Sequence, residues 1–134
     1  MTTSSSDALA AMKAGFVQGN VLAILRIEGL TVLAVAVTAF AHLNPNWWRF
    51  GALFLLPDIA FLAYLVNPRV GATAYNTLHS YIAPLLLGLT AQFAPAPSLM
   101  PFALIWTAHL GFDRALGYGL KYPSAFGHTH LTSK

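Results

Sequence analysis

The sequence has no cysteine, few charged residues and no cluster of basic residues. The absence of cysteine from all 134 residues excludes disulfides and thiolate chemistry. Only 8% of the residues are charged, whereas roughly a quarter are charged in ordinary soluble domains. The seven Lys and Arg residues are scattered, so the net charge of +3 does not indicate a nucleic-acid partner. The composition therefore excludes an ordinary soluble domain and gives no support to nucleic-acid binding.

Apolar residues make up 57% of the chain and gather in four segments joined by short turns. Each segment approaches the ~20 residues that a helix needs to cross the ~30 Å hydrocarbon core of a bilayer. Short turns favour antiparallel neighbours. We therefore expect an all-α fold, an integral membrane antiparallel four-helix bundle over residues 20–120. The predicted spans are residues 20–43, 47–66, 70–93 and 99–120.

Two tails flank the predicted bundle. Residues 1–19 form a polar tail that fits a short interfacial helix or a frayed end equally well. Residues 121–134 form the C-terminal tail. Because Lys and Arg gather on the cytoplasmic side of membrane proteins, both termini are expected in the cytoplasm. The basic residues on the side of the termini are Lys13, Arg69, Lys121 and Lys134, against Arg49 on the other side.

Three of the four acidic residues, Glu28, Asp58 and Asp113, lie inside the apolar segments, where a bilayer makes charge costly. With a rise of ~1.5 Å per residue, they lie roughly 9–12 Å from the cytoplasmic ends of their spans. His79 and His109 come out at roughly 13 and 15 Å on the same scale. The alternating spans thus place five side chains in one layer. We expect this layer to be the functional site and these five residues to be its catalytic candidates.

Other polar and aromatic residues share the faces that carry this layer. Trp106 lies on the same helical face as His109 and Asp113, and Asn76 precedes His79 by one turn. Arginines near the layer could tune its charge or hold an anionic group of a substrate, and aromatic rings could line a pocket. The candidate substrate-binding residues are Arg26, Arg114, Asn76, Tyr64, Tyr75 and Trp106.

Proline and glycine predict two local features. Pro57 and Pro84 fall inside spans, next to Asp58 and close to His79, and each is expected to distort its helix there. Small residues, among them Gly111, lie on one face of the fourth span and favour close contact with another helix.

Four interpretations of the layer stay open. The acids could pair with arginines and a protonated histidine and lock the helices together. They could bind a divalent metal, with Zn, Fe and Mn all compatible with such ligands. They could perform metal-free acid–base catalysis on an apolar substrate. They could also relay protons or ions, for which four short helices would need a homo-oligomer. The candidate metal ligands are Glu28, Asp58, His79, His109 and Asp113.

Short strings between Leu25 and Leu131 carry a resemblance to a known family. They are Leu25–Gly29, Leu56–Asp58, Asn67–Gly71, Tyr75–Asn76 with His79 and Tyr81, Trp106, Ala108–His109, Gly111–Arg114, Gly117–Tyr122 and Thr129–Leu131. This set resembles a family of small bacterial four-helix membrane proteins catalogued only as a domain of unknown function. The resemblance implies a bacterial inner membrane and adds His130 of the tail to the candidate site residues, but it implies no mechanism.

The preferred prediction is an intramembrane enzyme in the bacterial inner membrane, with both termini cytoplasmic. It would use acid–base or metal-assisted chemistry on a hydrophobic, lipid-like or isoprenoid-like substrate. The alternative is a proton- or ion-coupled transporter, or a membrane protein that binds a small ligand, acting as an oligomer. Whether the chain is an enzyme at all stays open at this point.

Overall fold

The computed structural model describes residues 5–6, 17, 19–43, 46–124 and 126–131. The regular elements within these ranges are helical, which confirms the predicted all-α class. The interfacial helix predicted for residues 1–19 lies almost wholly outside the described residues. The helices are α2 (Gly19–Ala41), α3 (Trp47–Phe54), the 3₁₀ helix η1 (Leu56–Leu65), α4 (Pro68–Leu78), α5 (Ile82–Thr90) and α6 (Leu99–Leu116).

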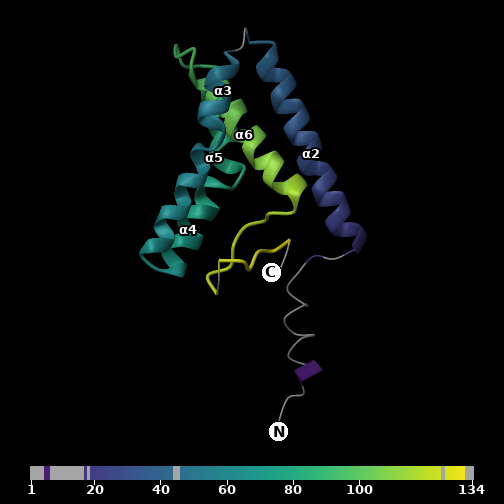
Figure 1. Ribbon diagram of the computed structural model, residues 1–134. Coiled ribbons are helices and arrows are strands. Elements are labelled where there is room, and N and C mark those ends of the chain that lie inside the picture. The colour runs from purple at the N-terminus through teal and green to yellow at the C-terminus, as the bar shows by residue number, and fades with distance from the viewer. Residues whose placement is uncertain (1–4, 7–16, 18, 44–45, 125, 132–134) are drawn as a thin grey trace.

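Helix α6 lies at the centre of the arrangement. Figure 1 shows α2 beside α6 on one side, with α3, α4 and α5 on the other. The packing partners of α6 include α2, α5 and α3, whereas α4 packs mainly against η1. The direction of the chain alternates from α2 to α3 and η1, to α4 and α5, and to α6 (Figure 1). Any site built from η1, α4 and α6 therefore combines segments that are far apart in the sequence.

The second and third apolar segments are interrupted next to the predicted polar layer. The α-helix of the second segment ends at Phe54, and a 3₁₀ helix with Pro57 in its first turn follows. In the third segment α4 ends at Leu78 and α5 begins at Ile82, two residues before Pro84. Proline cannot donate the backbone hydrogen bond that a continuous helix requires. The two breaks fall beside Asp58 and His79, where the sequence predicted distortion.

Helices α2 and α6 approach closely at a pair of glycines. A Cβ atom added to Gly111 would meet the backbone of Leu33 and the carbonyl oxygen of Gly29, and one added to Gly29 would meet α6 at Arg114. The close contact predicted for Gly111 is thus confirmed. Helix α6 is shorter than predicted, because it ends at Leu116 and is capped by Gly117, whose φ of +92° favours glycine.

Large apolar side chains cover much of the outer surface. Two helical stretches, Gly19–Ala41 and Trp47–Leu65, are long and apolar enough to cross a membrane. In α2 the only residues that are buried are Gly29, Ala36 and Phe40. A helix whose apolar side chains stay exposed in the folded chain fits a lipid environment better than water. The compartment, the orientation and the predicted number of spans stay predictions.

The segment after α6 folds back against the helices. Lys121 and Thr129 form an isolated antiparallel bridge, and the backbone N–H of His130 donates to the carbonyl of Leu120 at 3.0 Å. The side chain of Asn76 on α4 holds the same segment, accepting from Lys121 N at 2.7 Å and donating to Lys121 O at 2.8 Å. Residues 117–124 and 126–131, called the C-terminal segment below, therefore form part of the folded structure.

Candidate metal centre

Two aspartates and two histidines converge in the space between η1, α4 and α6. Asp58 lies in the first turn of η1, His79 follows the last residue of α4, and His109 and Asp113 lie one turn apart on α6. One ligand atom from each residue lies within 4.8 Å of the other three. We call these four residues the Asp/His cluster. They come from the two helix breaks and from the central helix.

The imidazole of His79 is oriented by Tyr75. Its Nδ1–H donates to the backbone carbonyl of Tyr75 at 3.0 Å, and the two rings stack with centroids 3.7 Å apart. Because a carbonyl only accepts hydrogen bonds, Nδ1 carries the proton, and Nε2 of the neutral ring presents a lone pair. That lone pair faces carboxylate oxygens of Asp58 at 3.3 Å and Asp113 at 3.5 Å. Such an arrangement requires a positive ion, either a proton or a metal.

His109 presents its own Nε2 to the same point. This atom lies 3.3 Å from Nε2 of His79, 3.4 Å from Asp58 Oδ1 and 3.6 Å from Asp113 Oδ2. Its other nitrogen, Nδ1, is buried and has no hydrogen-bond partner among the described residues. Asp113 Oδ2 also accepts a long hydrogen bond from the hydroxyl of Tyr75, at 3.5 Å. The nitrogen and oxygen atoms that these residues direct toward one another are thus all potential metal ligands.

The spacing of these atoms matches the coordination of a transition metal. A tetrahedral zinc ion with bonds of ~2.0–2.1 Å holds its ligand atoms about 3.3–3.4 Å apart. Five of the six separations in the Asp/His cluster are 3.3–3.6 Å. Two carboxylates and two neutral imidazoles carry two negative charges, which a divalent ion would balance. The cluster therefore combines ligand types, spacing and charge suited to one divalent ion.

Access to the cluster is uneven. The side chains of His79 and His109 are buried, and that of Asp113 is nearly so, whereas the side chain of Asp58 is 33% exposed. Closed centres with four protein ligands are typical of structural zinc, while catalytic centres keep a position open to water or substrate. A small molecule could reach the centre from the side of Asp58, because this ligand is the most exposed.

Two predicted binding residues hold the backbone around His79 instead of facing the centre. The guanidinium of Arg114 donates to the carbonyl of His79 at 2.9 Å and to that of Tyr118 at 2.7 Å. The indole N–H of Trp106 donates to the carbonyl of Leu78 at 2.7 Å. The break between α4 and α5 leaves the carbonyls of Leu78 and His79 without continuous helical partners. Arg114 and Trp106 thereby fix the position of His79.

The remaining predicted site residues lie away from the cluster. Glu28 lines a separate cavity beside α2, together with His130 of the C-terminal segment. Arg26 donates from Nε to the carbonyl of Ala115 at 2.8 Å, near the end of α6. Asn76 binds the backbone of Lys121, and the ring of Tyr64 packs at 5.0 Å from that of Phe126. The five-residue layer predicted from depth is thus divided between two places.

Lys121 is a buried residue that the sequence marked for membrane orientation and as part of the Gly117–Tyr122 string, but not as a site residue. Its ammonium group lies 3.3 Å from the ring centroid of Phe126 and 4.7 Å from that of Tyr75, and it donates to the carbonyl of Phe126 at 3.0 Å. Burial lowers its pKa, while the attraction of Asp113 and Asp58 opposes that shift. No periodic pattern marked this residue, because its neighbours come from η1, α4 and the C-terminal segment.

One comparison with known proteins gives a match. The family model described as "Domain of unknown function (DUF4260)" matches residues 22–133. The predicted resemblance to a family catalogued only as a domain of unknown function is confirmed, while its bacterial and four-helix details stay predictions. No curated protein and no solved structure matches the chain.

Proposed function

We propose that this chain, which belongs to the DUF4260 family of unknown function, is a membrane-embedded metalloprotein. Its Asp/His cluster would bind one divalent transition-metal ion and use it in chemistry on a hydrophobic substrate. The observation that carries the proposal is the convergence of four ligand atoms, with five of their six separations at 3.3–3.6 Å and the lone pair of His79 aimed at their centre.

The ligand set favours zinc and allows iron or manganese. Imidazole suits Zn and Fe, carboxylate suits Mn as well, and the near-tetrahedral spacing is typical of zinc. Tyr75 supplies the outer hydrogen bond that orients a metal-binding histidine, since its carbonyl accepts from Nδ1 of His79. A neutral centre of two carboxylates and one divalent ion would also avoid a net charge in an apolar environment.

The chemistry would take place at the exposed side of the cluster. A bound divalent ion acts as a Lewis acid on a carbonyl or phosphoryl group, or lowers the pKa of a bound water. Asp58 is the most exposed ligand, so it is the residue placed to exchange with water or substrate or to accept a proton. His79, His109 and Asp113 would hold the ion from the buried side. The apolar outer surface of the helices suits a substrate that arrives from the lipid.

A metal-free proton site is the second candidate, and one observation favours it. If both imidazoles are protonated, their two positive charges balance Asp58 and Asp113, and both Nε2–H groups have carboxylate oxygens within 3.6 Å. Such a cluster could serve acid–base catalysis or proton transfer. The two candidates differ in whether the folded protein retains a metal.

Elemental analysis of protein purified in detergent without chelators tests the proposal. The wild type and the control Glu28→Gln, which lies outside the cluster, should retain close to one metal ion per chain. His109→Ala and Asp58→Asn should lose it, and binding of added Co²⁺ should weaken by more than ~100-fold, because loss of an outer hydrogen bond alone costs 10–100-fold. Helical circular dichroism would verify that each variant is folded.

The visible spectrum of the Co²⁺-loaded protein provides a second readout, since tetrahedral and octahedral Co²⁺ absorb differently. If folded wild-type protein contained no metal and bound no added Zn²⁺ or Co²⁺, the metal proposal would be rejected in favour of the proton site. If both single variants, His109→Ala and Asp58→Asn, retained the metal, the ion would bind outside the Asp/His cluster.

A further inference from the structure

A cavity lies on the side of α6 that faces α2 (Figure 1), lined by α2, α6, the C-terminal segment and Tyr81 of the break between α4 and α5. Its volume is about 540 Å³. We call it the α2 cavity. Most of its wall is apolar and includes Ile24, Ile27, Val32 and Leu131. Ile24 and Ile27 are also exposed on the outer surface of α2. The cavity is thus large enough for part of a small molecule and continuous with a face suited to lipid chains.

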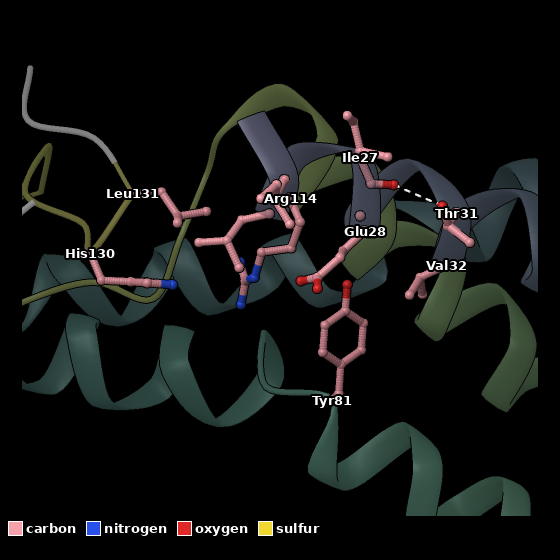
Figure 2. A pocket seen from close by; sticks show the side chains of 11 residues that line it. Ile27, Glu28, Thr31, Val32, Tyr81, Arg114, His130 and Leu131 are labelled. Carbon is pink, nitrogen blue, oxygen red and sulfur yellow. Dashed lines mark hydrogen bonds between the residues drawn. The ribbon is translucent and has the colours of Figure 1, made fainter. Parts of the chain in front are cut away.

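Polar groups converge at one part of this wall. Figure 2 shows the carboxylate of Glu28 and the hydroxyl of Tyr81 directed toward each other, with the guanidinium of Arg114 nearby. The hydroxyl oxygen of Tyr81 is buried and has no hydrogen-bond partner among the described residues. A buried hydroxyl without a partner is costly, and a bound molecule with a polar group would satisfy it.

His130 adds a hydrogen-bond donor from the C-terminal segment. The backbone N–H of Leu120 donates to Nδ1 of His130 at 2.8 Å, so the neutral ring carries its proton on Nε2. Figure 2 shows this ring directed toward Arg114 and the cavity. Gly119 allows the ring to lie against the backbone, since a Cβ atom there would collide with it. Burial lowers the pKa of His130, which favours the neutral form.

The charges around the cavity restrict the head group of a ligand. Glu28 would repel an anionic head, and Arg114 would repel a cationic one. A neutral hydroxyl can donate to the carboxylate of Glu28 and accept from Tyr81 or His130. We infer that the α2 cavity binds a neutral amphiphile with a hydroxyl head group and an apolar chain, such as a long-chain alcohol or a monoacylglycerol.

This inference depends on the lining of the α2 cavity and does not require a metal in the Asp/His cluster. The two places are nevertheless joined by one residue, because Arg114 lines the cavity and donates to the backbone carbonyl of His79. A ligand beside Arg114 would therefore lie next to the segment that positions a ligand of the Asp/His cluster. Loss of metal from the cluster would leave the cavity, its polar groups and the inference intact.

Three probes with the same chain and different heads test the inference. The purified 134-residue chain would be titrated in detergent with oleyl alcohol, oleate and oleylamine, and the bound probe would be counted by native mass spectrometry after the detergent is removed from the protein. Oleyl alcohol should bind at least ~10-fold more tightly than either charged probe, since one uncompensated charge costs more than a single hydrogen bond. Equal binding of all three, or preference for a charged probe, would overturn the inference.

Two variants assign the binding to the α2 cavity. Tyr81→Phe should weaken binding of oleyl alcohol by about 5–10-fold, the effect expected for one hydrogen bond. Tyr122→Phe, at an exposed position of the C-terminal segment, serves as the matched control. Glu28→Gln should reduce the discrimination against oleate. If Tyr81→Phe did not fold, the change of selectivity in Glu28→Gln would still show whether the probe binds in the α2 cavity. Unchanged affinities and selectivity in both folded variants would overturn the assignment.

Discussion

The two polar regions of this chain differ in how closely their side chains approach one another. In the Asp/His cluster, four nitrogen–oxygen pairs and one nitrogen–nitrogen pair lie 3.3–3.6 Å apart around a common point. In the α2 cavity, polar groups face a space of about 540 Å³. The first arrangement has room for a single ion and the second for part of a molecule. Carboxylate and imidazole side chains thus lie close together in one region and line an open space in the other.

The two regions share α6 and the break between α4 and α5, and they differ in their other supports. The Asp/His cluster depends on the breaks in the second and third apolar segments and on α6. The α2 cavity depends on the contact between α2 and α6 and on the returning C-terminal segment. A change at a support that the two regions do not share should therefore affect one region more than the other.

The largest effect that separates the regions is expected from Gly111→Ala. The added methyl group would collide with the backbone of α2 at Leu33 and Gly29, and such overpacking costs typically 1–3 kcal/mol. Thermal unfolding in detergent should occur at lower temperature, and binding of oleyl alcohol should weaken more than binding of Co²⁺. The matched control is Gly51→Ala, because a Cβ atom there meets nothing within 4 Å. Equal loss of both ligands would show that the two regions are not separately supported.

An intermediate effect is expected from Tyr75→Phe. The hydroxyl of Tyr75 donates to Asp113, so its removal deletes an outer contact of the cluster while keeping the ring that stacks on His79. Metal affinity should fall by about 10-fold, the lower end of the range for outer hydrogen bonds. Titration with a competing chelator would measure it. Binding of oleyl alcohol should not change, and a similar loss there would contradict the separation of the two regions.

The smallest effect is expected from pH. Burial lowers the pKa of His130 below its usual 6.5, so the folded chain binds fewer protons than the unfolded chain. The stabilisation that this neutral ring contributes is complete above about pH 6.5 and is lost as the pH falls through the lower pKa of the folded state. Limited proteolysis of the C-terminal segment should therefore accelerate at acidic pH.

His130→Gln is the control for the pH experiment, because glutamine does not titrate. In this variant the acid-dependent part of the proteolysis rate should disappear, whereas metal content at neutral pH should equal that of the wild type. A pH dependence that persisted unchanged in His130→Gln would assign the effect to another group.

Several features could be predicted from the sequence because they are local. Hydrophobic runs of about 20 residues predicted helices, and Pro57 and Pro84 predicted the places where those helices break. The i, i+4 spacing of His109 and Asp113 placed both side chains on one face of α6. The depth of Asp58 and His79 along their spans predicted that they lie at the level of His109 and Asp113. The structure places these four residues together.

Other features could not be predicted, because they depend on the rotation of each helix about its own axis and on the path of the chain after α6. Depth assigned Glu28 to the same layer, but depth does not specify which side of α6 a residue faces, and Glu28 lies in the α2 cavity. Asn76 was expected to bind substrate, yet its amide pairs with the backbone of Lys121. No local sequence pattern indicated that the C-terminal segment folds back against Asn76 and the α2 cavity.

The sequence by itself determined that this is a helical chain with unusual acids and histidines in apolar surroundings, since composition and hydrophobic runs are independent of tertiary contacts. Only the tertiary structure decided which polar groups meet. The packing of α2 against α6 at Gly29 and Gly111, together with the two proline breaks, directs Asp58 and Glu28 to different sides of α6. The physical reason is that helix spacing fixes angles within one helix, whereas angles between helices follow from the side chains packed between them.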